Sequence, residues 1–164
     1  MSASPALRPH KIPESVLVVV HTSAFDVLLI ERADARGHWQ SVTGSKERDG
    51  ETLVAACVRE VVEETGIAIG TAAVPMEALV DCGLVNVYEI YPRWRHRYAP
   101  GVTHNTEHVF ALLVPAGTPV ALSPREHVAW MWLPWREAAD KCFSPSNAEA
   151  ILHLPRWRPR EPSA

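Results

Sequence analysis

The chain has 164 residues, of which 47% are hydrophobic and 21% are charged, and its formal net charge is −3. This length accommodates one domain with a sizeable core, and the apolar content excludes a disordered chain. The small negative charge provides no general attraction to nucleic acids or anionic membranes, so we expect neither as a partner.

No apolar run approaches the roughly 18 residues of a membrane span, and the start of the chain contains no apolar signal core. The cysteines Cys57, Cys82 and Cys142 are odd in number and widely spaced, which does not suit a disulfide framework or a zinc site. We therefore predict a cytoplasmic protein with reduced thiols. Monomer and homodimer both remain open.

Apolar runs at 15–21 and 27–30 predict strands that the break over 22–26 can join as a hairpin, and a short strand follows at 39–43. After a helix over 52–65, the expected elements are extended segments at 66–69, within 76–91, at 107–114 and at 128–133, a loop at 93–101, and helices at 134–141 and 146–153. We predict a leader over 1–13, a single domain over 14–154 and a disordered tail over 155–164. Trp130 and Trp132 alternate onto one face of their strand, so we expect both in the core.

The helix over 52–65 has clear boundaries, because Thr52 suits the N-cap and Gly66 suits the left-handed residue that ends a helix. On a helical wheel, Glu60, Glu63 and Glu64 fall within roughly 100° of arc. The adjacent arc, which we expect to face the core, carries Leu53, Val54, Cys57, Val58 and Val61.

This acidic stripe has two interpretations. A solvated acidic helix face is common. However, carboxylates four residues apart repel each other, and acids near a helix C-terminus oppose its dipole. A bound divalent cation removes both costs, and hard cations such as Mg²⁺ prefer oxygen ligands.

Residues 44–67 resemble the sequence box of the Nudix hydrolases, which reads Gly, five residues, Glu, seven residues, Arg-Glu, an aliphatic residue, any residue, Glu-Glu, any residue, Gly and an aliphatic residue. The matching residues are Glu51, Arg59, Glu60, Val61, Glu63, Glu64, Gly66 and Ile67. Six residues, instead of five, separate Gly44 from Glu51, and a strict count would put Ser45 in the glycine position. We interpret the extra residue as a loop insertion, which costs little entropy.

The resemblance implies an α/β (α+β) fold, namely an α/β/α sandwich with a mixed central sheet in which the box forms a loop-helix-loop. It also implies Mg²⁺, with Mn²⁺ as a substitute, bound by Glu60 and Glu64. Glu126 is implied as another metal ligand or as the base, although a plain loop acid explains it equally well on composition. Two further catalytic candidates are Glu63, as a supporting ligand or an aid to the attacking water, and Arg59, which would neutralise or orient a carboxylate.

A narrower resemblance, to the bacterial dihydroneopterin triphosphate diphosphatases within that family, spans roughly residues 11–152. It is carried by the runs 38–44 and 95–107, by Lys11 with Pro13, by the Glu126-His127 pair, and by Ser144 with Ser146-Asn147. It implies hydrolysis of dihydroneopterin triphosphate to the monophosphate and pyrophosphate, a step of folate biosynthesis, with dNTPs such as dATP as further substrates. The implied substrate contacts are Lys11, Arg32, Thr43 and Ser144.

Other functions remain open from the sequence. The basic segment 93–98 suits a phosphate clamp or a solvated turn. A general dNTP-sanitising or dinucleoside polyphosphate Nudix hydrolase is the first alternative, and a non-catalytic nucleotide-binding Nudix module is the second, although the box retains its acids. An enzyme that removes an RNA 5′ diphosphate is disfavoured by the net charge. The string from His104 to His108 spells a zinc-peptidase motif but falls in a predicted strand, where that motif requires a helix.

Overall fold

The computed structural model describes residues 9–157, and the predictions for 1–8 and 158–164 lie outside this range. Its centre is strand β1 (Glu14–His21), which pairs in parallel with β6 (His104–Leu113), and β6 pairs antiparallel with β5 (Leu79–Glu89). On its other side, the first half of β1 pairs antiparallel with β4 (Val42–Ser45).

The sheet divides next to β1. Strand β2 (Asp26–Arg32) meets β1 only at the His21–Val27 pair, as the end of the expected hairpin, and then diverges to pair with β3 (Trp39–Gln40) and β7 (His127–Pro134). Because β4 and β2 leave β1 from opposite ends, the sheet opens between them. This opening determines where a ligand can enter.

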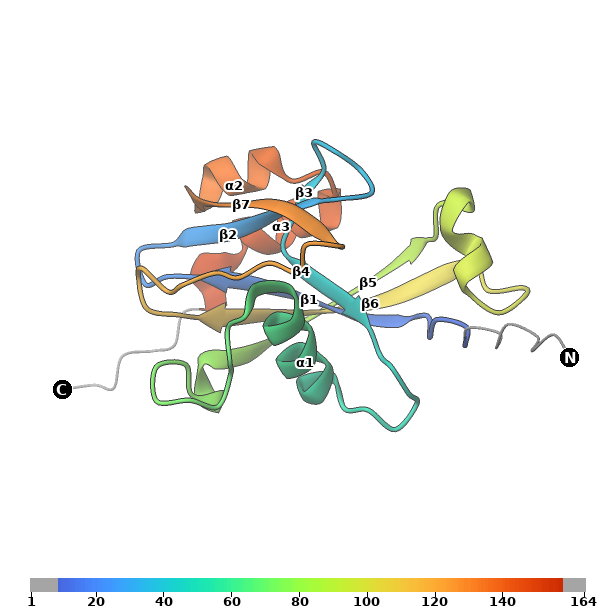
Figure 1. The fold of residues 1–164 in the computed structure, drawn as a ribbon, viewed down its shortest axis with the longest axis horizontal. Helices are drawn as coiled ribbons and strands as arrows, with labels where there is room; N and C mark the ends of the chain where they lie inside the picture. The colour runs from blue at the N-terminus through green and yellow to red at the C-terminus, as the bar shows by residue number, and fades with distance from the viewer. Residues whose placement is uncertain (1–8, 158–164) are drawn as a thin grey trace, which may run out of the picture.

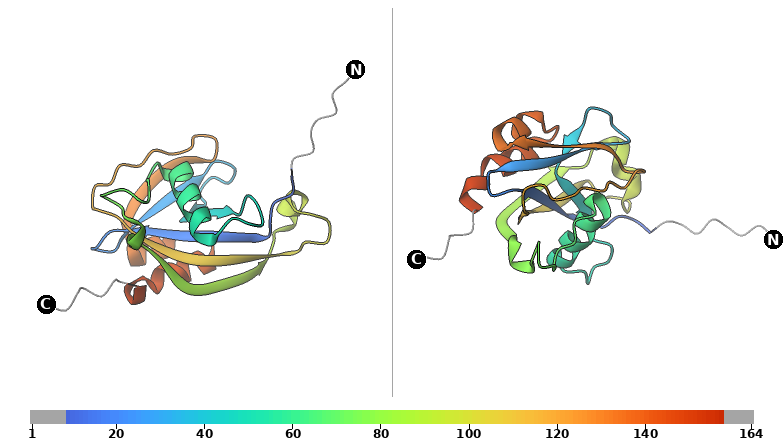
Figure 2. Two further views of the ribbon diagram at one scale, coloured as in Figure 1. Left: turned by 90° about the horizontal axis from the view of Figure 1, so that it is seen from below. Right: turned by 60° about the vertical axis from the view of Figure 1, so that its left-hand side comes forward.

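Helices cover both faces of the mixed sheet, which confirms the predicted α/β/α sandwich (Figures 1 and 2). Helix α1 (Leu53–Thr65) packs on one face, and α2 (Trp135–Lys141) with α3 (Pro145–Leu152) packs on the other. Three short 3₁₀ helices complete the described chain: η1 (Met76–Ala78), η2 (Pro92–Arg97) and η3 (Leu154–Trp157). None of the helices in residues 9–157 is long and apolar enough to cross a membrane.

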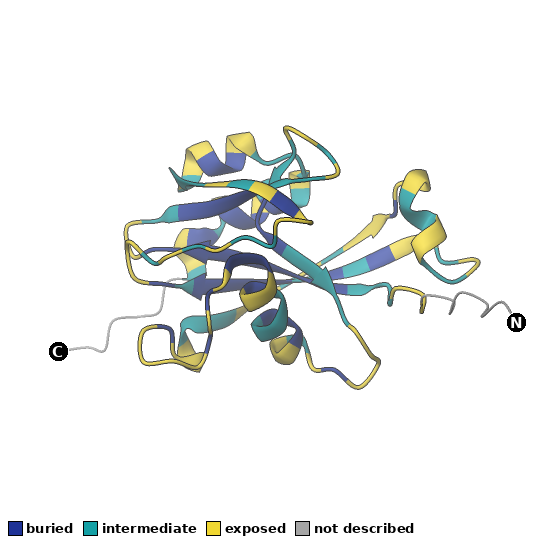
Figure 3. Cartoon of the chain, in the orientation of Figure 1, coloured by how far each residue is buried: buried dark blue, intermediate teal, exposed yellow. Residues whose placement is uncertain are grey.

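Strand β1 is buried on both faces, as its continuous run of apolar residues suggests (Figure 3). Val16 and Val18 belong to the core on the α1 side, whereas Leu17 and Val19 belong to the core on the α2–α3 side. The same alternation sends neighbouring residues of β6 to opposite faces. Each layer of helices therefore has its own apolar cluster.

The structure corrects several details of the sequence analysis. Val54 was expected in the core but is 42% exposed, because α1 is rotated toward its acidic side and buries Glu64 with Cys57. Trp130 was also expected in the core and is 45% exposed, since β7 extends past the cluster on which Trp132 packs. The expected loop at 93–101 begins as η2, and residues 155–157 of the predicted disordered tail belong to η3.

Candidate active site

The acidic residues of α1 are positioned by the two ends of the helix. Thr52 adopts an extended conformation, and its Oγ1 accepts a hydrogen bond from Ala55 N at 3.1 Å. Gly66 ends the helix at φ 73°, a left-handed conformation that glycine adopts at little cost. Both predicted caps are thus confirmed, and they fix where α1 begins and ends.

Glu60 packs directly on the backbone of Gly44. A Cβ atom placed on Gly44 would lie 1.9 Å from Glu60 Cδ, so any larger residue here would force the Glu60 carboxylate out of its present position. This close approach requires glycine at position 44, although one additional residue separates it from Glu51. The extra residue is accommodated in the loop between β4 and α1, and the backbone beside Glu60 keeps the glycine.

Arg59 connects this loop to the helix. Its Nε and Nη2 donate to the two carboxylate oxygens of Glu51 at 2.9 and 2.8 Å, and Nη2 also donates to the carbonyl oxygen of Ser45 at 3.0 Å. Its Nη1 donates to Glu60 Oε1 at 2.7 Å and lies 3.5 Å from Glu63 Oε2. Arg59 therefore orients carboxylates, one of the two roles that the sequence suggested for it.

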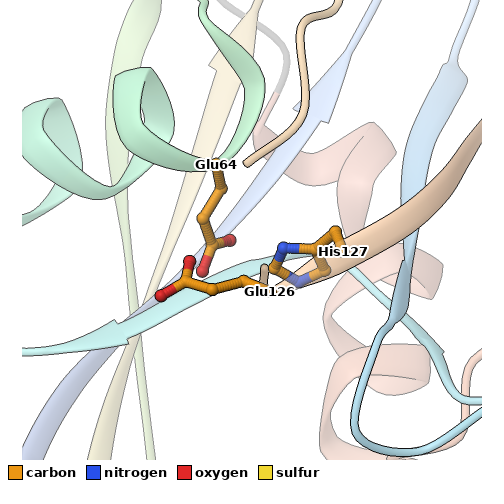
Figure 4. Close-up of side chains that lie close together, drawn as sticks. All are labelled: Glu64, Glu126 and His127. Atoms are coloured by element: carbon orange, nitrogen blue, oxygen red, sulfur yellow. The ribbon is translucent and has the colours of Figure 1, made fainter. Parts of the chain in front are cut away.

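Three side chains from two distant segments meet at the end of α1: Glu64 from the helix, and the neighbouring Glu126 and His127 from the start of β7 (Figure 4). One ligand atom from each of Glu64, Glu126 and His127 lies within 4.8 Å of the others. Glu64 is buried, and its Oε2 accepts a hydrogen bond from Thr43 N at 3.3 Å. The buried His127 Nδ1 has no hydrogen-bond partner among the described residues.

The electrostatics of these acids suit a site that binds a cation. Burial, more than any other cause, raises the pKa of Glu60 to about 7, and burial together with the charge of Glu60 raises the pKa of Glu64 well above its ordinary value. Burial and the nearby Arg32 lower the pKa of His127 to about 4. A neutral imidazole beside carboxyls that a cation would keep ionised is a donor set that suits a divalent ion.

Glu60, Glu64 and Glu126 line one cleft of about 980 Å³, large enough for a nucleotide-sized ligand. It brings together every site residue predicted from the sequence except one: Lys11, Arg32, Thr43, Arg59, Glu60, Glu64, Glu126 and Ser144. The exception is Glu63, whose side chain is 50% exposed and whose contact is with Arg59.

Basic side chains face the acids across the cleft. Lys11, which lay in the predicted leader, is held by a backbone bridge to Tyr98, and burial and the charge of Arg97 lower its pKa. Arg32 is fixed by a pair of hydrogen bonds to Asp34 at 2.8 and 2.7 Å and by the ring of Trp94, 4.9 Å away. Cations held at fixed positions suit phosphate oxygens.

Aromatic and hydroxyl side chains line the rest of the cleft. Tyr91 lies between Trp94 and Phe143, with ring centroids 5.4 and 6.4 Å away. Ser144 precedes α3, and its hydroxyl lies 3.0 Å from that of Ser146. A planar ring system could stack against this wall.

Three residues of the site were not predicted from the sequence. Asn105 and Glu107 line the cleft, and His127 is a possible metal ligand in its own right. Asn105 and Glu107 alternate along β6, so both face the cleft. The run 95–107, which carries part of the narrower resemblance, includes both residues, but five consecutive polar residues from His104 to His108 gave no indication of which side chains face a ligand.

Comparison with known proteins decides the family. The NUDIX domain model matches residues 11–154. The chain belongs to the Nudix family. Dihydroneopterin triphosphate diphosphatase of Escherichia coli K12 is 42% identical over 143 residues, which cover 87% of this chain and 91% of that protein. The Haemophilus influenzae protein of the same name is 38% identical, and the match covers 87% of each chain.

Solved Nudix structures agree with this assignment. The structure of the E. coli dihydroneopterin triphosphate pyrophosphohydrolase matches with a TM-score of 0.80 and 40% identity, covering 90% of this chain and 97% of that one. A Caenorhabditis elegans Ap4A hydrolase matches with a TM-score of 0.64 at 18% identity, covering 87% and 95%, and shares the fold alone. Nudix hydrolases generally use divalent metal ions, and the cluster at the end of α1 fits such an ion.

Proposed function

We propose that this protein is a Mg²⁺-dependent pyrophosphohydrolase that converts dihydroneopterin triphosphate and water into dihydroneopterin monophosphate and pyrophosphate. The observation that carries the proposal is a single cleft with a cluster of carboxylates at one end, among them the buried Glu64, and fixed cations beside them. The cleft occurs in a chain that is 42% identical to the E. coli diphosphatase. The retained acids Glu51, Glu60, Glu63 and Glu64 favour an enzyme over a binding module.

Glu60, Glu64 and Glu126 would hold Mg²⁺ or Mn²⁺. The bound ion supplies charge neutralisation for the polyphosphate and lowers the pKa of an attacking water. Raised carboxyl pKa values beside a His127 nitrogen that has no hydrogen-bond partner among the described residues fit this role, because a bound cation would keep these acids ionised. Arg59 holds Glu60 in place through Nη1.

The remaining residues bind and orient the substrate. Lys11 and Arg32 would contact phosphate oxygens, which carry most of the negative charge in the transition state. Thr43 and Ser144 would hydrogen-bond the pterin or its side chain. Glu63 is our candidate to assist the attacking water, a role that requires its exposed side chain to turn into the cleft; Glu126 is the alternative base.

A substrate panel tests this function. Purified protein with Mg²⁺ is assayed against dihydroneopterin triphosphate, dATP, 8-oxo-dGTP and diadenosine tetraphosphate, and pyrophosphate release is measured. We expect the highest kcat/KM for the pterin substrate. A higher kcat/KM for 8-oxo-dGTP or diadenosine tetraphosphate would favour the sanitising or dinucleoside polyphosphate alternative instead.

A further inference from the structure

The floor of the cleft, away from the carboxylates of α1, is built from three adjacent strands. β1 contributes Ser15, β6 contributes Asn105 and Glu107, and β5 contributes Tyr88. The register places Asn105 opposite Tyr88 in the β5–β6 ladder, so these side chains share one face of the sheet. This floor is polar, although it lies directly beside the apolar cluster under α2 and α3.

Glu107 is the unusual member of this floor. It is only 5% exposed, yet no ion pair within residues 9–157 includes it. Its neutral partners are the side chains of Asn86 and Ser146, and Ser146 Oγ lies 3.4 Å from its Oε1. Burial raises its pKa to about 7. When it is ionised, a carboxylate with only two neutral partners can still accept further hydrogen bonds.

Asn105 provides a second unused acceptor. Its Nδ2 donates to Ser15 Oγ at 2.7 Å and to Tyr88 Oη at 3.0 Å, so both amide hydrogens are engaged. Its Oδ1 is buried and has no hydrogen-bond partner among the described residues. A buried acceptor left unpaired costs free energy, which a ligand N–H would recover.

These acceptors indicate what kind of ring the floor recognises. A dihydropterin contains a 2-amino-4-oxopyrimidine, whose ring N–H and neighbouring amino group present two donors side by side. A carboxylate accepts such a pair with both of its oxygens. Guanine carries the same edge, whereas adenine offers one donor and one acceptor and does not match an ionised carboxylate.

We propose that Glu107 determines the ring specificity of this enzyme by accepting hydrogen bonds from the N–H and amino group of a 2-amino-4-oxopyrimidine edge, with Asn105 Oδ1 as an additional acceptor. The proposal rests on the pyrophosphohydrolase function proposed above and deepens it. The ring would lie over the strand floor, with Tyr91 and Phe143 beside it as apolar contacts. Its triphosphate would then extend toward the carboxylates of α1.

The substitution Glu107→Gln tests the proposal because glutamine keeps the shape and replaces one acceptor by a donor, which matches adenine better than a pterin. We expect the ratio of kcat/KM for dihydroneopterin triphosphate to that for dATP to fall at least about 10-fold, and the dGTP-to-dATP ratio to fall likewise. Glu137→Gln, an exposed position on α2, is the matched control and keeps both ratios. Equal losses on all substrates in Glu107→Gln would overturn the proposal.

A binding measurement on the wild-type chain is independent of catalysis and of how the variant folds. Neopterin binding is followed by its fluorescence, and guanosine should displace it at a concentration at least about 10-fold lower than adenosine. Equal displacement by the two nucleosides would refute the role of Glu107. If the wild-type chain hydrolysed dGTP and dATP but not the pterin triphosphate, the proposed function would be refuted. The ratio of kcat/KM for dGTP to that for dATP, compared between wild type and Glu107→Gln, would still test the role of Glu107.

Discussion

Glu64 is a buried acid, and Glu60, one turn earlier on the same helix, is half-buried. Each is held by a backbone or side-chain donor, Glu60 by Arg59 and Glu64 by Thr43 N, and burial raises both pKa values. We expect Glu60→Gln or Glu64→Gln to lower kcat at least about 100-fold, since losing one electrostatic contact in an active site costs roughly 2.7 kcal/mol.

The fold should survive these substitutions, because a neutral amide is easier to bury than a carboxylate. Steady-state kinetics with Mg²⁺ and a thermal unfolding curve check the two parts of this prediction. Glu149→Gln, on an exposed position of α3, provides the comparison. Wild-type turnover in either active-site variant would refute the metal assignment.

Gly44, in β4, and Gly50, in the loop that follows it, offer a matched pair. A Cβ on Gly44 would overlap Glu60 Cδ, whereas a Cβ on Gly50 would have no heavy atom within 4 Å. We expect Gly44→Ala to displace the Glu60 carboxylate and reduce kcat at least about 10-fold, because misplacing a catalytic contact by about 1 Å has large effects. Gly50→Ala should leave kcat unchanged. If the two variants behaved alike in the same assay, the close approach would have no catalytic role.

At the scale of elements, the loop before α1 is fastened to the helix by Glu51 and Arg59. The guanidinium of Arg59 lowers the pKa of Glu51 to about 2, from an ordinary value near 4.5. An acid with a lowered pKa contributes stability at pH values above its unfolded pKa, and this contribution is lost as the pH falls toward the folded pKa. The free energy of unfolding of the wild type should therefore exceed that of Glu51→Gln above about pH 5.

This difference between the two proteins should disappear as the pH falls from about 4.5 to 2. Urea unfolding of both proteins across this range measures it. A difference that stays constant with pH would mean that Glu51 stabilises the loop by packing and not through its charge.

The elements that could be predicted well are those whose sequence signals act locally along the chain. The start and end of α1 follow from Thr52 and Gly66, which act through their own backbone geometry. The exposure of Val54 and Trp130 depends on how far the neighbouring layers extend, and this is a tertiary property. For the same reason, the sequence predicted one strand over 39–43, where the structure has β3 and β4 separated by Ser41.

At the scale of the whole molecule, the site has a part that is contiguous in sequence and a part that is not. The box from Gly44 to Ile67 is contiguous, so its acids and their spacing could be recognised directly. Asn105 and Glu107 reach the cleft only because β6 pairs in parallel with β1, which aligns Glu107 with Ser15. Parallel pairing between segments this far apart leaves no local pattern, which explains why the floor of the cleft was missed.

Because the proposed metal ligands come together only in the folded chain, metal binding should raise the stability of the whole fold. A cation that binds only the folded chain stabilises it, by about 2.7 kcal/mol at roughly 100 times its Kd. For a domain of this size, that gain corresponds to an increase in Tm of several degrees. We expect EDTA to abolish hydrolysis and Mg²⁺ to restore it and to raise the Tm, whereas Na⁺ at equal ionic strength should do neither.

The double variant Glu60→Gln, Glu64→Gln separates specific binding from a general salt effect. Without metal, it should be at least as stable as the wild type, because two mutually repelling acids with raised pKa values have become neutral. With Mg²⁺, its Tm should stay constant, since the cation has lost its main ligands. An equal increase in Tm for both proteins would show that Mg²⁺ acts elsewhere on the surface, and the acids of α1 would then need another explanation.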